Sequence, residues 1–475
     1  MANENKLQAI ISHCKEYGFV FPSSEIYDGL GAVYDYGQNG AELKKNIKDY
    51  WWKSMTQLHD HIVGIDAAIF MHPTTWKASG HVDNFSDPMI DNKDSKKRYR
   101  VDHLIEAYAE QLAPDASAAL IQSMEQLIAA DDFAGLKNLI DTNKIKCSVS
   151  GTCNWTDVRQ FNLMFGTQLG SVAEESSEIY LRPETAQGIF VNFLNVQKTG
   201  RMKIPFGIAQ IGKAFRNEIV ARGFIFRMRE FEQMEMQFFV RPGTQQEWYQ
   251  YWKEARMQWH LSLGISPDKY RFHDHVKLAH YADAACDIEY DFPMGFKELE
   301  GIHSRTDFDL KNHQQFSGKK LTYFDTELNQ HYIPYVVETS IGLDRTFLML
   351  LSEAYQEEDL STEEKQDARV VLKLPAMLAP YKLAILPLLK KDGLPEIAKE
   401  LMAECRGSFK CFYEEKDAIG KRYRRMDAIG TPFCVTIDHQ TKEDGTVTIR
   451  HRDSMLQERV ALKDIKQIVL NAVQY

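Results

Sequence analysis

The sequence predicts an α+β protein, with a core built on an antiparallel β-sheet, a helical insertion in that core, and a small C-terminal α/β domain. Three observations lead to this fold class. Residues 223–240 place charged residues between aromatic and β-prone ones, as antiparallel strands do when one face lines a site. Residues 104–145 are rich in Ala and Leu at helical spacing. After residue 380, short apolar runs alternate with a helical segment.

The length of 475 residues predicts two or three domains. We expect residues 1–85 to form the N-terminal part of the core, residues 86–160 a largely helical insertion, and residues 161–355 the rest of the core. The polar, acidic stretch 356–369 reads as a linker or a frayed helix end. Residues 370–475 then form the C-terminal domain, with strands near 381–388, 409–413, 432–437 and 446–450 and a helix over 394–405.

Composition narrows the class of protein. No apolar run reaches the roughly 18 residues that span a bilayer, and the first residues lack the pattern of a signal peptide, so we expect no membrane and a cytoplasmic location. Seven cysteines are an odd number, which suits a reducing compartment. Cys147 and Cys153 are not spaced as CxxC, and no second pair completes a four-ligand set, so no zinc is expected.

Charge is divided unevenly along the chain. The net charge is −10, but residues 370–475 hold 18 Lys and Arg against 14 Asp and Glu, which leaves −14 on the preceding residues. A mildly basic domain after an acidic body is a weak indication of RNA binding, because a solvated charged surface gives the same count.

The chemistry-bearing residues are densest in 212–218 and 226–235, where arginines and glutamates alternate with aromatics. A hairpin places part of this set on one sheet face, where guanidinium groups can hold phosphates and carboxylates an ammonium. The alternative is a salt-bridged solvent face. Residues 207–213 fit the spacing GxxxxGK, but Ala214 stands where a phosphate loop needs a hydroxyl, so a P-loop enzyme is excluded.

Two further segments carry charge in apolar surroundings. Pro183 places Arg182 and Glu184 at a strand end or helix start, which by itself is also an ordinary helix entry. Residues 335–351 read as an apolar strand with one glutamate, Glu338, turning at Gly342 into a helix that bears Arg345. A lone charge on a buried strand needs a ligand or an ion-pair partner.

Together these segments resemble the glycyl-tRNA synthetases, a family of class II aminoacyl-tRNA synthetases. The resemblance lies in LRPETAQG (181–188), FRNE (215–218), REFEQME (229–235), ELEGI (298–302) and RTDFDL (305–310). In the C-terminal domain, IGKRYRR (419–425) and DAIGTP (427–432) are similar to the family's anticodon-binding module. The segment around 71–81 looks like the first class II motif, which forms the dimer.

The resemblance implies the class II fold and a two-step ligase reaction. Glycine reacts with ATP, with Mg²⁺, to give glycyl-adenylate, and the glycyl group then passes to the 3′ end of tRNA(Gly). It also implies a homodimer. By motif match, the catalytic residues are Arg216, Arg345 and Glu298, and Glu298 is the Mg²⁺ ligand.

The same match implies which residues surround each substrate. The ATP contacts are Arg216, Asn217, Glu218, Phe226, Arg227, Met228, Arg229, Glu230, Phe231, Glu298, Leu299, Gly342, Leu343, Asp344 and Arg345. The glycine contacts are Arg100, Glu184, Phe231, Glu232, Gln233, Met234, Glu235, Glu338, Thr339, Ser340, Ile341 and Gly342. The tRNA contacts are Lys421, Arg422, Arg424 and Arg425, with help from Arg450 and Arg452.

Two departures from the family pattern stand out. Residues 91–95 read DNKDS where some relatives carry a cysteine pair, and Thr339 replaces a frequent proline. Two other hypotheses remain open at this point. One is a catalytically silent, synthetase-like RNA-binding protein, against which the intact Arg216, Glu218, Phe231 and Arg345 set argues. The other is a sister ligase for threonine, proline, serine or histidine.

Overall fold

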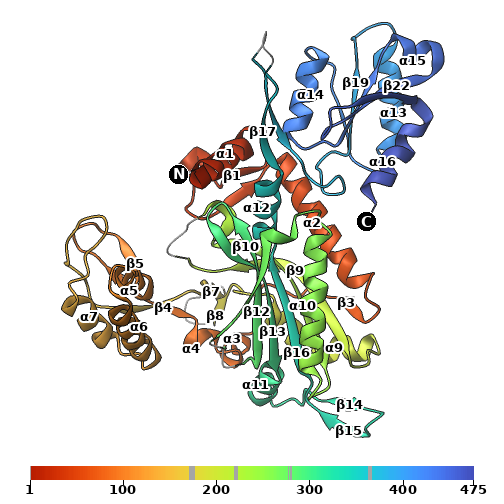
Figure 1. Cartoon of the computed structure of the whole chain (residues 1–475). Helices are drawn as coiled ribbons and strands as arrows, with labels where there is room; N and C mark the ends of the chain where they lie inside the picture. The colour runs from red at the N-terminus through yellow and green to blue at the C-terminus, as the bar shows by residue number, and fades with distance from the viewer. Residues whose placement is uncertain are drawn as a thin grey trace.

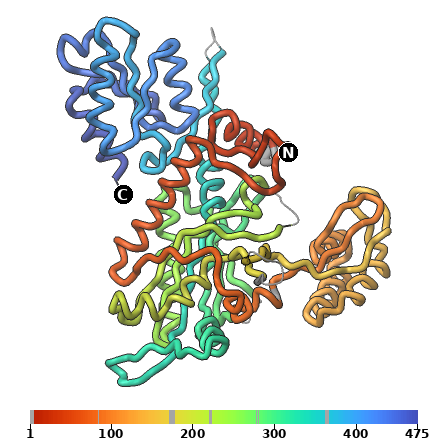
Figure 2. The backbone as a smooth tube through the Cα atoms, turned by 180° about the vertical axis from the view of Figure 1, so that it is seen from behind, coloured from red at the N-terminus to blue at the C-terminus, as the bar shows by residue number. Residues whose placement is uncertain are grey.

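The computed structural model describes residues 2–170, 177–218, 223–276, 278, 281–361 and 366–474. It has a central body, an insertion that projects from one side, and a C-terminal domain at one end (Figure 1). Figure 2 shows from behind that the insertion and the C-terminal domain lie at separate corners of the body. The predicted fold class is confirmed.

A seven-stranded sheet organises the body in the order β11-β12-β13-β16-β10-β9-β3. All neighbours are antiparallel except β3 and β9, which are parallel. The predicted hairpin is the pair β9–β10, in which Phe231 lies opposite Ala214 and Glu235 opposite Gln210. The strands are β3 (Ile62–Gly64), β9 (Phe206–Phe215), β10 (Glu230–Val240), β11 (Tyr270–Asp274), β12 (Ala284–Phe292), β13 (Gly295–Thr306) and β16 (Tyr335–Gly342).

Helices bury the two faces of this sheet to different extents. One face packs its whole length on α2 (Gln38–Thr56), α10 (Gln245–Leu261) and α12 (Leu343–Ala354), around Trp51, Met236, Trp252 and Phe347. The other face is covered only at its far end, where α8 (Ala186–Val191), α9 (Phe193–Thr199) and α11 (Phe308–Ser317) pack around Phe239 and the side chains near it. The uncovered half of the second face is where charged side chains gather.

Short elements surround the body. They are α1 (Ala2–Glu16), β1 (Val20–Pro22), η1 (Glu25–Tyr27), β2 (Tyr34–Tyr36), α3 (Pro73–Ala78), α4 (His81–Asn84), β7 (Gly166–Leu169), β8 (Ser177–Tyr180), η2 (Phe224–Phe226), η3 (Pro267–Lys269), β14 (Tyr323–Asp325) and β15 (Gln330–Tyr332).

The insertion has its own apolar core around Ile105, Met124, Leu136 and Trp155. Its helices α5 (Val101–Ala109), α6 (Pro114–Ala129) and α7 (Phe133–Thr142) lie where helical spacing predicts them. A three-stranded sheet in the order β5-β4-β6, from β4 (Ser86–Asp91), β5 (Arg98–Arg100) and β6 (Arg159–Asn162), joins these helices to the body.

The segment predicted as a linker is instead mostly a β-ribbon, apart from residues 362–365, which lie outside the described residues. Here β17 (Tyr355–Asp359) follows α12 directly and pairs with β18 (Ala368–Leu372). The acidic composition hid these strands because their buried side chains, such as Arg369 and Val371, show no clear apolar alternation.

The C-terminal domain is α/β, as predicted, and its sheet has five strands, one more than the sequence indicated. Its order is β20-β19-β21-β22-β23, with β19 parallel to both neighbours. The elements are β19 (Leu383–Pro387), α13 (Leu394–Cys405), β20 (Cys411–Tyr413), α14 (Ile419–Ala428), β21 (Phe433–Ile437), α15 (His439–Asp444), β22 (Thr446–His451), β23 (Gln457–Ala461), η4 (Leu462–Asp464) and α16 (Ile465–Val473). Of the helices described, none combines the length and apolarity that a membrane span requires.

Candidate active site

Three glutamates meet on the uncovered half of the sheet face. Glu235 on β10 and Glu338 on β16 both accept hydrogen bonds from the amide Nε2 of Gln237, at 2.6 Å each. Thr185, which precedes α8, donates its hydroxyl hydrogen to Glu235. Glu184 lies next to Thr185 and accepts a hydrogen bond from Gln187 Nε2 at 2.9 Å. The predicted carboxylate trio is therefore assembled from three separate segments.

Arg305 and His303 contact the two oxygens of the Glu338 carboxylate. His303 Nδ1 lies 2.8 Å from one carboxylate oxygen and Arg305 Nη1 3.0 Å from the other. Arg305 is buried and also donates two hydrogen bonds to the Asp309 carboxylate, from Nε at 2.8 Å and from Nη2 at 3.0 Å. Burial alone raises the pKa of Glu338, but Arg305 and His303 outweigh it and lower that pKa to about 2.

The pKa values of the other two glutamates are shifted in opposite directions. Burial works against the charge of Glu184, yet His81, whose Nε2 lies 3.4 Å away, lowers the pKa of this carboxyl well below its usual range. Burial, followed by the charges of Glu338 and Glu184, raises the pKa of Glu235 well above its usual range. The cluster thus has one carboxyl whose charge is disfavoured beside two whose charge is favoured, and a cation bound among them would favour the charged form of all three.

Guanidinium groups lie beside this pocket. Arg216 donates from Nε to the carbonyl oxygen of Pro183 at 3.1 Å, and its Cζ lies 5.3 Å from the Phe231 ring centroid. Arg345, at the start of α12, pairs with Glu298 at 3.0 Å and stacks on Phe226 at 4.4 Å. The charge of Arg345 is the main reason that the pKa of Glu298 is lowered. The four residues on which the sequence hypothesis depended, Arg216, Arg345, Glu184 and Glu338, are thus brought to one face.

Arg229 holds the ends of the loop between β9 and β10. Its Nε donates to Glu218 O and its Nη1 to Gly31 O, both at 3.0 Å, while its backbone N–H donates to Ala32 O at 2.9 Å. Residues 219–222 of the loop lie outside the described residues. Arg229 was predicted to contact ATP, and the structure places it as a brace between this loop and residues 31–32, a partner that no sequence signal indicated.

Several predicted contacts point away from this face, because side chains alternate along a strand. Glu232 lies on the opposite face, where it pairs with Lys44 at 2.8 Å. Asp344 joins the same buried group through Lys44 at 2.7 Å, and it accepts a hydrogen bond from the backbone of Glu232. Side-chain contacts with substrate are therefore corrected for the strand residues Glu232, Met234, Leu299, Thr339 and Ile341. They are also corrected for Met228, Leu343 and Asp344, which lie outside the strands and are buried.

Arg100 lies at the base of the insertion, with Asp87 at 3.1 Å and Asp102 at 2.6 Å. The charge of Glu218 also acts on it, so Arg100 belongs to the rim of the site. The residues that sequence reasoning missed are Gln237, His303, Arg305 and His81. Alternation along β10 from Glu235 predicts Gln237, and His303 and Arg305 lie in or beside strings already singled out.

Helix α14 carries the cations predicted to contact RNA. Lys421 is exposed. Arg424 pairs with Asp367 at 2.9 Å, and Arg425 pairs with Glu414 at 2.8 Å and Asp417 at 3.0 Å. Arg422 is corrected: it is buried and donates to the carbonyl oxygens of residues 387, 388 and 414. Arg450 and Arg452 are buried as well, so they also serve the interior of the domain.

Two loops of the insertion form a hydrogen-bonded cluster. Asn92 Oδ1 accepts from the backbone N–H of Asp94 and Ser95, and Cys147 Sγ accepts in the same way from Val149 and Ser150. Ser95 Oγ reaches Cys147 Sγ at 3.3 Å, and Ser150 Oγ reaches Asn92 Oδ1 at 3.0 Å. Positions 92, 95, 147 and 150 thus repeat the spacing of two CxxC knuckles, but a set with one thiol does not fit a structural zinc.

Within the described residues, no group of three or more His, Cys, Asp or Glu side chains is arranged to hold a metal by protein ligands alone. Glu298 is half exposed at the edge of the site, and its charge contributes to the raised pKa of Asp287. Glu298 alone at this open edge fits a hydrated Mg²⁺ that takes its remaining ligands from phosphate and water.

Three protein-family profiles match the chain. Residues 168–354 match the tRNA synthetase class II core domain (G, H, P, S and T), residues 87–119 and 113–163 the glycyl-tRNA synthetase insertion domain 1, and residues 382–472 an anticodon binding domain.

Curated relatives match over nearly their full length. The glycine–tRNA ligase of Chlorobaculum tepidum is 56% identical over 460 residues, which cover 96% of this chain and 97% of the relative. Those of Treponema denticola (52% over 459 residues; 96% and 94%) and Lysinibacillus sphaericus (50% over 477 residues; 100% of both) are similar.

Proposed function

Because the chain belongs to the glycyl-tRNA synthetase family of class II aminoacyl-tRNA synthetases, we propose a specific placement of its substrates on the sheet face described above. The family membership makes the chain an ATP-dependent ligase that joins glycine to tRNA(Gly). It also favours the glycine ligase over the two alternatives left open by the sequence, a sister ligase and a catalytically silent homologue. What remains to be assigned is which side chains meet each substrate.

The glycine ammonium would lie among Glu184, Glu235 and Glu338, with Ser340 nearby. The observation that carries this assignment is the convergence of three buried carboxylates from separate segments, with Gln237 bridging Glu235 and Glu338 at 2.6 Å each and Thr185 donating to Glu235. A cation that enters this pocket would favour the charged form of Glu235 against its burial and the charges of Glu338 and Glu184. Glycine has no side chain to recognise, so selectivity against alanine would come from crowding where a methyl group would lie.

The nucleotide would lie along the guanidinium side of the site. Arg216 would hold the α-phosphate and the glycine carboxylate as a bidentate donor, and Arg227 the outer phosphates. Adenine would stack between Phe231 and Arg345, with Glu218 at its amino group. The present contacts of Arg216 with Phe231 and of Arg345 with Glu298 support this, and the charges of both arginines act on Glu298.

Catalysis then needs positioning and charge neutralisation, and no side-chain nucleophile. The glycine carboxylate attacks the α-phosphorus, pyrophosphate leaves, and Arg216 stabilises the negative charge that develops on the phosphate oxygens. Mg²⁺, when bound with the nucleotide, would supply further neutralisation of the phosphates, with Glu298 as its protein ligand.

The same proposal covers the partners. Lys421, Arg424 and Arg425 would contact tRNA through its phosphates. A homodimer is supported by the β3 edge of the sheet, beside which a hollow of about 370 Å³ is lined by Leu58, Trp248 and Tyr251. Leu58 and Tyr251 are 57% and 46% exposed in the single chain. A cytoplasmic location is supported by the seven free thiols.

Glycine-dependent ATP–pyrophosphate exchange tests the assignment. Wild-type enzyme should exchange with glycine and not with alanine or threonine. Arg216→Ala should abolish exchange while circular dichroism and thermal unfolding stay those of a folded protein. Exchange by Arg216→Ala near the wild-type rate would remove Arg216 from its assigned role. For the dimer, sedimentation velocity should show Tyr251→Asp shifted toward monomer, and an unchanged dimer would exclude this surface.

A further inference from the structure

One buried carboxylate joins the anticodon-binding helix to the ribbon outside its domain. Asp427, in the last turn of α14, is fully buried. It accepts two hydrogen bonds from Arg450 on β22, at 2.8 and 2.9 Å, and one from Arg369 on β18, at 3.3 Å. Arg450 belongs to the same domain, whereas Arg369 belongs to the β17–β18 ribbon, so Asp427 connects two parts of the molecule.

Arg369 extends this connection on the ribbon side. Its side chain is 1% exposed, its Nε donates to Glu358 on β17 at 2.8 Å, and its Nη1 donates to the carbonyl oxygen of Arg452 at 2.8 Å. A second tie between α14 and the ribbon, Arg424 with Asp367, is about one-third exposed on both sides. Solvent screens that second pair, so the buried pair is the stronger of the two links between α14 and the ribbon. His13 on α1 also contacts the carbonyl oxygen of Ala428, at 2.8 Å, and ties the end of α14 to the body.

The ribbon is continuous with the helix that begins at the ATP site. β17 follows Ala354, the last residue of α12, and Lys373 after β18 donates its backbone N–H to Ala354 O at 2.8 Å. The other end of α12 carries Arg345. Figure 1 shows α14 beside β17, with α12 leading from the ribbon into the body. A chain of packed elements therefore runs from the proposed RNA-binding helix to the proposed nucleotide site.

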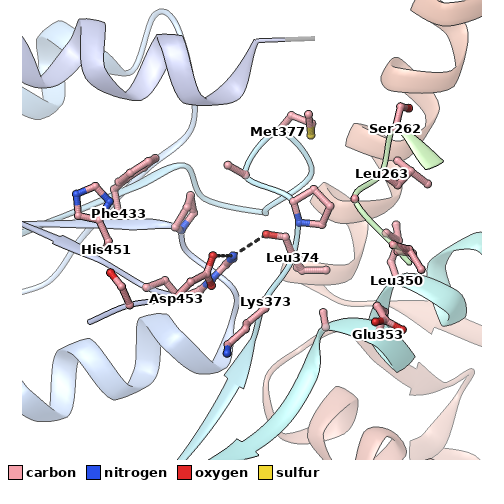
Figure 3. A pocket seen from close by; sticks show the side chains of 18 residues that line it. Ser262, Leu263, Leu350, Glu353, Lys373, Leu374, Met377, Phe433, His451 and Asp453 are labelled. Atoms are coloured by element: carbon pink, nitrogen blue, oxygen red, sulfur yellow. Dashed lines mark hydrogen bonds and ion pairs between the residues drawn. The ribbon is translucent and has the colours of Figure 1, made fainter. Parts of the chain in front are cut away.

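The opposite side of the domain interface is open. A cavity of about 560 Å³ separates the body from the C-terminal domain there (Figure 3). Leu263 and Leu350 line it from the body, Lys373 and Leu374 from the connector, and Phe433 and His451 from the C-terminal domain. Side chains do not fill this space, so the packing between the two parts is looser here, although Arg452 Nη2 donates to the carbonyl oxygen of Leu374 at 2.8 Å.

We propose that Asp427 and Arg369 are positioning residues for the transfer step. They fix α14 relative to α12, so that a tRNA gripped by the C-terminal domain presents its 3′ hydroxyl to the adenylate. This inference rests on the proposed function of α14 and of the nucleotide site. Neither residue touches a substrate, and the first step of the reaction, which needs no tRNA, does not use the connection.

The main test is Arg369→Gln, which breaks the link to the ribbon and leaves the Asp427–Arg450 pair inside the domain intact. The matched control is Lys373→Gln on the same ribbon; Lys373 pairs with Glu358 at 2.8 Å at a partly exposed position. For each enzyme, glycine-dependent pyrophosphate exchange, kcat and tRNA KM of charging, and thermal unfolding are measured.

Arg369→Gln should exchange within about twofold of wild type, while kcat for charging falls about tenfold or more with little change in tRNA KM, since misplacement by about 1 Å can cost that much. Lys373→Gln should match wild type throughout. Arg369→Lys keeps the positive charge but loses the two-pronged guanidinium hydrogen bonds. It serves as the second variant if Arg369→Gln proves unstable, and its kcat for charging should fall by a smaller factor while its exchange rate stays near wild type.

Three results would overturn the inference. The first is charging by Arg369→Gln at the wild-type kcat. The second is a loss seen only in tRNA KM, which would indicate weaker binding and no positioning. The third is a parallel fall in exchange and charging, which would indicate general damage. Absence of glycine-dependent exchange in the wild type would instead contradict the proposed function, so the two failures are distinguishable.

Discussion

Replacing Glu235 by glutamine separates substrate binding from folding. Glu235 is buried beside Glu338 and Glu184, and its pKa is raised by burial and by their charges. In the free enzyme Glu235→Gln therefore imitates the protonated acid that the pocket already favours. With glycine bound, the same change removes one of three negative charges around the ammonium.

The magnitudes follow from these contacts. Loss of one buried, hydrogen-bonded partner of a charge costs about 2–4 kcal/mol, so glycine KM should rise roughly 30- to 700-fold at 1.4 kcal/mol per tenfold. The free energy of unfolding of Glu235→Gln should be equal to that of wild type or higher. A carboxyl with a raised folded pKa stabilises the fold below its unfolded pKa of about 4.5, and this contribution is lost as pH rises through the folded pKa. Glutamine has no such loss, so the variant should equal or exceed wild type at pH 7.5.

Glu338→Gln is the matched control. Its carboxylate is the acceptor for Arg305 and His303. The substitution therefore takes a negative partner away from the buried guanidinium of Arg305 and should lower the free energy of unfolding by about 2–4 kcal/mol. Pyrophosphate exchange against glycine concentration and urea unfolding measure both quantities in both variants. The reasoning is refuted if Glu235→Gln unfolds as readily as Glu338→Gln, or if it keeps the wild-type glycine KM.

Three further predictions concern pH, the insertion and the C-terminal domain. Glycine KM should fall as pH rises through the raised pKa of Glu235, with proton release on binding measured by calorimetry in two buffers; a pH-independent KM would contradict this. Replacing Asn92, Ser95 and Ser150 with cysteine should complete two CxxC knuckles around Cys147 and create a site that binds one zinc per chain, while wild type binds none at equal concentration. The Co²⁺-substituted triple variant should show the absorption of a tetrahedral site; a triple variant that binds no metal would show that the loops lack ligand geometry. Arg422→Ala should cost about 2–4 kcal/mol of stability because three carbonyl oxygens lose a buried donor, whereas Lys421→Ala should leave stability unchanged and raise tRNA KM; equal effects would mean that burial does not separate their roles.

Local pattern was sufficient for most of the fold. The helix over 394–405 is found at Leu394–Cys405, and the strand with Glu338 ends at Gly342, because helical spacing and a turn glycine are properties of neighbouring residues. The ribbon at 355–372 was missed for the complementary reason. Its strands are stabilised by pairing with each other and by Arg369 buried against the C-terminal domain, and neither contact leaves a mark in local composition.

The sequence by itself determined the site's ingredients: which segments carry the arginines and glutamates, and which family they resemble. Only the tertiary structure decided which of them face one pocket. Side chains alternate along β10 and β16, so Glu235 and Glu338 meet at Gln237 while Glu232 and Thr339 turn to the other face. A pKa likewise depends on charges brought together from distant segments, which is why the pKa of Glu235 is raised while those of Glu184 and Glu338 are lowered.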